Sequence, residues 1–258
     1  MDNLEEVKIK NNIDLSPYKF ECDKLICDSI PHPLPKTTFK LGMIGKSGSG
    51  KTSLLRNLTE KGGKNKIYKN KFSNVFYISP SIKSMENKPK LQEDRFYKSL
   101  NELPEILDRI KNNEDHSGLT LLIMDDITNE IKESGELGNN LKQIYQNNRH
   151  LGNPILDDDD NVLESGALSS IILSQRCNNL SRFIRSQLTH LIIFDPRSTK
   201  SEMKTLFDEF FHCNIDVFNE ILRRTFDNQK YNFLFIDINN SKIYRNFDTE
   251  YIIPKTYL

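Results

Sequence analysis

The sequence lacks any apolar run that approaches the ~20 residues of a membrane-spanning helix. Its longest apolar runs, Leu119–Met124 and Leu191–Phe194, have the length of buried strands. The first residues, Met1–Lys10, mix both signs of charge and contain no apolar core, so they do not have the pattern of a secretory signal. These absences predict a soluble, intracellular protein that does not enter a membrane.

Cysteine is scarce, and its spacing fits neither a zinc site nor a disulfide framework. We expect free, buried thiols at Cys22, Cys27, Cys177 and Cys213. An excess of charge is also missing, because 36 basic side chains balance 36 acidic ones. Overall charge therefore gives no argument for nucleic-acid binding, although it leaves room for a local basic surface.

What the sequence does contain is an alternation of apolar strand patterns and amphipathic helix patterns. Residues 1–38 are expected to form an irregular N-terminal arm, since the prolines of Pro31–Pro35 interrupt any helix. Over 39–258 the alternation predicts one α/β domain with a mostly parallel central sheet flanked by helices. Phe233–Ile238 and Lys242–Phe247 are joined by an Asn-Asn turn and predict a C-terminal β-hairpin.

One stretch, residues 153–166, interrupts this alternation. It contains Asp157–Asp160, and four adjacent carboxylates repel one another and favour solvent. We expect an acidic loop inserted into the domain. A metal site at the four aspartates is the alternative.

The strongest motif follows the first predicted strand and precedes the first predicted helix. It matches G-x-x-x-x-G-K-[ST] at every position, which is typical of a phosphate-binding loop in this context. Its glycines let backbone N–H groups turn inward around phosphates, and the following helix adds its N-terminal dipole. We expect Lys51 to reach the β- and γ-phosphates of ATP, and the Thr52 hydroxyl to bind Mg²⁺. The predicted nucleotide-binding residues are Gly45, Lys46, Ser47, Gly48, Ser49, Gly50, Lys51, Thr52 and Ser53.

Polar side chains also follow two further apolar runs. Asp125 and Asp126 come directly after Leu119–Met124. A strand that ends there delivers carboxylates beside the phosphates, where Asp125 can hold Mg²⁺ through water and Asp126 can polarise the attacking water. Gln175 follows the run Ser170–Leu173, and an amide at that position can contact the γ-phosphate or the attacking water. By pattern alone, a surface glutamine is the simpler explanation.

Together with Asn148-Arg149-His150 and Ile171-Ile172-Leu173-Ser174-Gln175, these motifs resemble the genome-packaging ATPases of large double-stranded DNA viruses and virophages. Those proteins form the poxvirus-type branch of the FtsK/HerA superfamily of P-loop NTPases. The resemblance covers roughly residues 39–250. Two features depart from the family pattern: the acidic stretch that separates Arg149 from the next strand, and the zero net charge.

The resemblance implies a hexameric or otherwise ring-shaped motor that hydrolyses ATP to move double-stranded DNA into a capsid. It implies ATP and Mg²⁺ as cofactors, capsid proteins as possible partners, and a place in the host cytoplasm or virion. A neighbouring subunit would supply an arginine finger, a device worth ~10³–10⁵ in rate where it occurs. Arg149 is the first candidate and Arg185 the second. The implied catalytic residues are Lys51, Asp126, Arg149 and Gln175, the last as γ-phosphate sensor.

A nucleotide or metabolite kinase is the main alternative, with Arg223 and Arg224 as candidate lid arginines. Another P-loop NTPase that does not act on DNA is a further one. A GTPase switch is disfavoured, because Asn87–Lys90 lacks the aspartate of N-K-x-D. The sequence also lacks the signature of transporter ATPases. DNA phosphate contacts would fall on a lysine-rich stretch, which a solvated loop explains equally well: Lys61, Lys64, Lys66, Lys69 and Lys71.

Overall fold

The computed structural model describes most of the chain from residue 30 onward. The described residues are 30–36, 38–61, 67–86, 88–112, 117–127, 130–131, 134–164, 166–197, 199–227 and 230–254. The expected N-terminal arm lies outside them up to residue 29, as do Cys22, Cys27, Lys64 and Lys66. Within these ranges, none of the helices has the length and apolar character needed to cross a bilayer.

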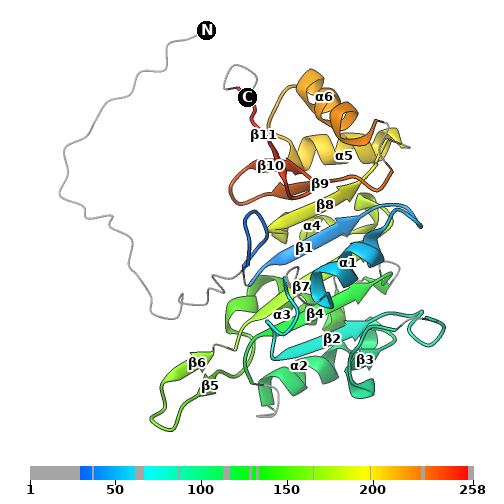
Figure 1. Cartoon of the computed structure of the whole chain (residues 1–258). Helices are drawn as coiled ribbons and strands as arrows, with labels where there is room; N and C mark the ends of the chain where they lie inside the picture. The colour runs from blue at the N-terminus through cyan, green and yellow to red at the C-terminus, as the bar shows by residue number, and fades with distance from the viewer. Residues whose placement is uncertain are drawn as a thin grey trace, which may run out of the picture.

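A nine-stranded sheet forms the centre of the described structure, in the order β11-β10-β9-β8-β1-β7-β4-β2-β3 (Figure 1). The strands from β8 to β3 run parallel, whereas β9, β10 and β11 continue the sheet antiparallel. The predicted α/β fold, mostly parallel sheet and C-terminal hairpin are therefore confirmed. The strands are β1 Lys40–Ile44, β2 Asn74–Ile78, β3 Phe96–Tyr97, β4 Thr120–Asp125, β7 Leu168–Ser174, β8 His190–Phe194, β9 Phe233–Asp237, β10 Lys242–Arg245 and β11 Thr249–Tyr251.

Helices cover both faces of the sheet, because successive strand residues point to opposite faces. In β4, Leu121 and Ile123 join the core cluster that contains the buried side of α1. Leu122 and Met124 join the larger cluster, which contains the buried sides of the other helices. This two-sided burial explains why β4 and β7 are continuous apolar runs in the sequence. The helices are α1 Lys51–Thr59, α2 Leu103–Asn112, α3 Gly135–Gln146, α4 Arg182–Gln187, α5 Lys200–Phe210 and α6 Ile215–Phe226.

The register of the three central strands decides where the polar motifs meet. β7 lies between β1 and β4, with Ile44 opposite Ser174 and Leu173 opposite Asp125. All three strands are parallel, so their carboxyl ends share one edge of the sheet. The phosphate-binding motif, Asp125 with Asp126, and Gln175 therefore emerge at this edge, which we call the carboxyl edge.

Residues 153–166 form a separate two-stranded hairpin, made of β5 Ile155–Leu156 and β6 Val162–Glu164. It projects from the opposite edge of the sheet, which we call the amino edge (Figure 1). Asp157–Asp160 lie in its turn, with Asp158–Asp160 exposed, as the charge run predicts. The expectation of a loop is wrong for the flanking residues, because their apolar and β-branched side chains favour strands on both sides of a turn.

Smaller differences concern short elements and the cysteines. The two-residue strand β3 and the terminal strand β11 are too short to be predicted from periodicity. The helix expected over Asn179–Gln187 begins later, at Arg182, where the Ser181 hydroxyl caps it by accepting from the Ile184 N–H at 3.3 Å. Cys177 is buried and Cys213 half-buried, and both are free thiols.

Candidate nucleotide-binding site

The loop Gly45–Gly50 connects β1 to α1 and has the backbone geometry of a phosphate cradle. The N–H of Gly45 donates to the Ser174 carbonyl at 3.0 Å, which ties the loop to the end of β7. Gly48 and Gly50 have φ values of 73° and 104°, a region that side chains disfavour. These positive angles turn successive N–H groups toward one side, as anion nests require.

Close packing also makes Gly45 necessary. A Cβ at this position would lie 2.6 Å from Ser49 Oγ and 2.8 Å from Phe194 Cβ. Both distances are shorter than real Cβ contacts, so any side chain would displace the loop from the ends of β1 and β8. The three glycines of the loop are thus explained by a positive φ at Gly48 and Gly50 and by lack of space for a side chain at Gly45.

The Lys51 ammonium lies inside the loop. Its Nζ donates to the Lys46 carbonyl at 3.0 Å and also to the Gly45 carbonyl. Burial lowers the pKa of Lys51, while Asp125 and Asp126 act in the opposite direction. The cation therefore stands between the loop and two carboxylates, as a group that binds phosphate beside a metal site should.

Asp125 ends β4 as a buried carboxylate with 8% of its surface exposed. Its Oδ2 accepts a 2.7 Å hydrogen bond from the Tyr77 hydroxyl on the neighbouring strand β2. Burial raises the pKa of Asp125, and Asp126 raises it further, while the Tyr77 hydrogen bond and Lys51 oppose the shift. A buried carboxylate with a raised pKa is stabilised by a cation, so Asp125 with the Thr52 hydroxyl fits a hard divalent ion such as Mg²⁺.

Asp126 and Gln175 meet across the ends of β4 and β7. Gln175 Nε2 donates to Asp126 Oδ1 at 3.4 Å, and both side chains are exposed. Asp126 has a positive φ of 56°, which turns the chain sharply after the strand. These two residues line a cavity of about 670 Å³ together with Lys51, Thr52 and Asp125. Ser47, Gly48, Gly50 and Ser53 line the same cavity, so nine of the predicted site residues are brought together there.

A buried carboxylate that the sequence pattern did not reveal holds the segment after Gln175. Glu202, in the first turn of α5, accepts from the backbone N–H groups of Cys177 at 2.8 Å and Asn178 at 3.3 Å. The Ser174 hydroxyl donates to the Arg176 carbonyl at 2.7 Å. Gln175 is thus anchored on both sides, although its own side chain faces the cavity.

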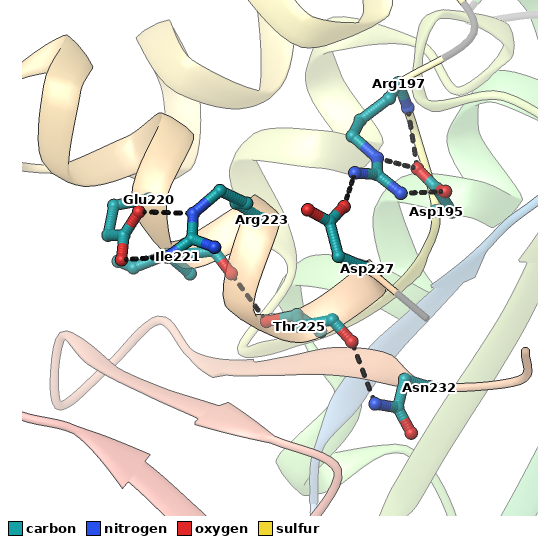
Figure 2. Close-up of polar contacts among 8 residues, drawn as sticks. All are labelled: Asp195, Arg197, Glu220, Ile221, Arg223, Thr225, Asp227 and Asn232. Atoms are coloured by element: carbon teal, nitrogen blue, oxygen red, sulfur yellow. Dashed lines mark hydrogen bonds and ion pairs between the residues drawn. The ribbon is translucent and has the colours of Figure 1, made fainter. Parts of the chain in front are cut away.

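A second set of contacts fixes the segment before β9. Arg197 lies between Asp195 and Asp227 and donates to both, with Nε to Asp195 Oδ1 at 2.9 Å (Figure 2). Asn232 Nδ2 donates to the Thr225 carbonyl at 2.8 Å, so the segment is also tied to the end of α6.

The exposed Tyr231 lies within this segment and lines the cavity. Its Cδ1 is 3.5 Å from where a Gly50 Cβ would stand. The segment before β9 therefore places an aromatic ring against the phosphate-binding loop.

Arg149 is far from this cavity. The neighbouring Asn148 donates through Nδ2 to the carbonyls of Thr38 and Leu168, both at 3.1 Å, which fixes Arg149 at the amino edge. Leu168 is the first residue of β7 and Ser174 the last, so the two edges are about 20 Å apart at the usual rise per residue. Arg149 is exposed there and cannot reach the loop of its own chain.

Several other predicted residues lie outside the cavity. Arg185, the second candidate for the arginine finger, donates to both carboxylate oxygens of Glu209 at 2.7 Å. Its guanidinium is therefore engaged in an ion pair within its own subunit. Arg223 is exposed and ion-paired with Glu220 on α6 (Figure 2). Arg224 is also exposed and ion-paired with Glu220, and neither arginine lines the cavity. Of the lysine-rich stretch, the described Lys61, Lys69 and Lys71 follow α1 and are likewise absent from the cavity wall.

Comparison with known proteins agrees with this geometry. A family model of the NACHT domain matches residues 41–156, which include the loop and the Asp125-Asp126 pair but less than half of the chain. No curated protein matches the sequence.

Solved structures resemble the chain over most of its length. The genome packaging NTPase B204 of Sulfolobus turreted icosahedral virus 2, in complex with sulfate, has a TM-score of 0.58 at 17% identity. The match covers 82% of this chain and 96% of that one. The same NTPase with ATP-gammaS gives 0.55 at 17% identity, covering 80% and 95%. B204, the DNA-packaging ATPase of Sulfolobus turreted icosahedral virus, gives 0.56 at 16% identity, covering 84% and 99%.

The fold and the loop geometry define a P-loop NTPase. Its structural similarity to viral genome-packaging ATPases confirms, at the level of the fold, the resemblance that the motifs indicate. At identities of 16% and 17% this similarity concerns the fold alone, so substrate and partners are argued separately.

Proposed function

We propose that this chain is the ATP-hydrolysing subunit of a motor that translocates double-stranded DNA and packages a viral genome into a capsid. One observation carries the proposal. Lys51, Asp125, Asp126 and Gln175 line one cavity, whereas Arg149 lies at the opposite edge of the sheet, out of reach of that cavity in its own subunit.

The roles follow from the positions of these groups. Lys51 binds the β- and γ-phosphates after exchanging its hydrogen bonds to the loop carbonyls. Thr52 and Asp125 hold Mg²⁺, which neutralises phosphate charge when bound. Asp126 accepts a proton from the attacking water, and Gln175 orients that water or the γ-phosphate while Asp126 holds its amide.

A ring of subunits completes the site in this proposal. A head-to-tail contact places the amino edge of one subunit against the carboxyl edge of the next, and repetition of that contact closes a ring. Arg149 then approaches the γ-phosphate bound by the neighbour and stabilises the charge that develops during transfer. The DNA substrate and the capsid partner are proposed by analogy with the solved packaging NTPases.

The test measures ATP turnover by the purified full chain with and without linear double-stranded DNA. We expect the rate of ATP hydrolysis per subunit to rise with subunit concentration, because assembly completes the site, and to rise further when DNA is added. The Lys51→Ala variant should be inactive with and without DNA. Turnover that DNA leaves unchanged, together with no DNA binding by the assembled protein, would remove the motor function while leaving an ATPase. Transfer of phosphate to added nucleosides would instead identify a kinase.

A further inference from the structure

The β5–β6 hairpin exposes apolar side chains that no other described part of the chain covers. Leu156, Val162 and Leu163 are 45%, 63% and 68% exposed. Leu156 and Val162 are opposite each other in the register, so they form one apolar pair on one face. Within the described structure the hairpin pairs with no other strand. A two-stranded sheet of this kind gains little stability by itself, so a covering partner would stabilise it.

The hairpin is nevertheless mounted firmly on the domain. Gly118 N donates to the Asn153 carbonyl at 2.8 Å, and Asn153 Nδ2 donates to the Lys111 carbonyl at 2.7 Å. Where the two arms of the hairpin meet, a Cβ on Gly166 would lie 2.3 Å from the backbone of Gly152. Such close contact holds the hairpin at a defined position on the amino edge.

The turn of the hairpin carries unbalanced negative charge. Asp157 Oδ1 accepts from the N–H groups of Asp159 at 2.9 Å and Asn161 at 2.8 Å, so this carboxylate shapes the turn. Asp158, Asp159 and Asp160 are exposed, and none of them is ion-paired within the described residues. The hairpin thus offers an apolar stem and an acidic tip.

The carboxyl edge carries the complementary charge. Lys83 follows β2 and Lys98 follows β3, and both are exposed. β2 and β3 are paired with Ile78 opposite Tyr97, so the two lysines follow the ends of adjacent strands. In keeping with this placement, contact with Lys98 lowers the pKa of Lys83. In the described residues neither forms an ion pair with a carboxylate. Ser81 and Met85, on either side of Lys83 in the sequence, line the nucleotide cavity.

We propose that the β5–β6 hairpin docks on a second copy of this chain, with its acidic turn against Lys83 and Lys98 beside the neighbour's nucleotide cavity. The inference rests on the proposed ring and names a contact within it. Arg149 precedes the hairpin by a few residues at the same edge, so this contact would bring Arg149 and the acidic turn to the same neighbour. The hairpin alone is smaller than a stable interface, so it supplements the surface around Arg149.

The experiment reverses charge on each side separately and then on both. The full chain is mixed with Mg–ATPγS and linear double-stranded DNA, and the assembled fraction is measured by mass photometry across subunit concentrations. Asp158→Lys with Asp159→Lys, or Lys83→Asp with Lys98→Asp, should each raise the concentration for half-assembly by at least about tenfold. Combining all four substitutions should restore assembly to within about threefold of wild type.

Matched variants test the apolar stem. Leu156→Ser with Val162→Thr should weaken assembly, whereas Ile215→Thr, an equally exposed apolar residue on α6, should not. Thermal melting and binding of a fluorescent ATP analogue verify that each variant is folded and retains its loop.

Three results would overturn the inference: normal assembly of both charge-reversed proteins, no recovery on combining them, or weakened DNA binding with normal assembly in the lysine variant. In each of these the wild type still assembles, so the proposed motor stands. A wild type that never assembles would overturn the ring and the hairpin contact together.

Discussion

The Tyr77 hydroxyl donates a 2.7 Å hydrogen bond to Oδ2 of Asp125, from strand β2 to its neighbour β4. The bond favours the charged carboxylate and leaves the remaining lone pairs of Asp125 for a cation. Tyr77→Phe removes this bond and keeps the ring, so we expect the Mg²⁺ concentration for half-maximal ATP turnover to rise about tenfold.

Tyr97→Phe is the matched control, because Tyr97 lies on the adjacent strand β3 and contacts Glu105 and Arg109 instead. Its Mg²⁺ dependence should equal that of wild type. An unchanged Mg²⁺ dependence in Tyr77→Phe would mean that Asp125 does not hold the ion.

Asp126→Asn should separate nucleotide binding from hydrolysis. The amide retains the size of the side chain but cannot accept a proton from water, so we expect ATP to bind with unchanged affinity and turnover to fall by about 10² or more. Equilibrium binding of a fluorescent ATP analogue and phosphate release measure the two effects. Turnover at the wild-type rate would exclude Asp126 as the general base.

Glu202→Gln should slow turnover from a distance. The new amide can accept from only one of the two N–H groups of Cys177 and Asn178, so the segment that presents Gln175 loses one of its anchors. We expect kcat to fall about tenfold with little change in KM for ATP, and Glu202→Asp to recover part of the loss. Equal losses in Gln175→Ala and in the double variant would show that both act through one element. A change in KM alone would contradict this positioning role.

Arg149→Ala should be complemented by an inactive partner. If the finger acts between subunits, Arg149→Ala and Lys51→Ala proteins are each inactive, yet mixtures contain junctions with an intact loop and an intact arginine. We therefore expect mixing to recover a measurable fraction of ATP turnover, with a maximum near equal amounts. No recovery at any ratio, in proteins that co-assemble, would contradict action in trans. Mixing Lys51→Ala with Asp126→Asn is the control, since both changes affect the same subunit's cavity.

The buried His190 should make stability fall as the solution becomes acidic. Burial lowers the pKa of His190 to about 4, while Asp237 opposes the shift, and the ring stacks on Phe235. A depressed histidine pKa stabilises the fold above the unfolded pKa of about 6.5, and this contribution is lost as pH falls toward the folded value.

Between pH 7.5 and 5.0 the loss from this one group amounts to about 2 kcal/mol. His190→Phe should retain the stacking and lack this component of the pH dependence. Urea unfolding of both proteins at the two pH values measures the difference. Identical pH dependence in the two proteins would show that His190 does not titrate on unfolding.

The parts of the site that sequence can predict are those with a local pattern. The phosphate-binding loop is one contiguous motif, and β4 is an apolar run that ends in acidic residues, so the places of Lys51 and Asp125 beside one cavity can be predicted from the order of residues. The order of the strands in the sheet, in contrast, has no local pattern in the sequence. That Gln175 contacts Asp126 depends on β7 lying between β1 and β4, and the sequence contains the three strands without stating their order.

Residues that act through tertiary contacts have no such pattern. Tyr77 is 48 residues from Asp125, and Glu202 is 25 residues from Cys177. Nothing in the local sequence distinguishes this tyrosine from other strand residues or this glutamate from other helix residues. The strands of the hairpin do have a local pattern of apolar and β-branched residues. The four adjacent aspartates between them favour a solvated loop, and this signal outweighs the strand pattern on either side.

Gly152 and Gly166 are in close contact, so the β5–β6 hairpin between them can be replaced as a unit. Because its entry and exit touch, the intervening chain can be lengthened, shortened or exchanged while the two ends stay where the core requires them. Specificity for a neighbouring molecule can therefore diverge at this point without altering the chemistry at the other end of the sheet. A chimera that carries a different hairpin between these glycines should fold and bind nucleotide, but it should no longer assemble with wild-type subunits.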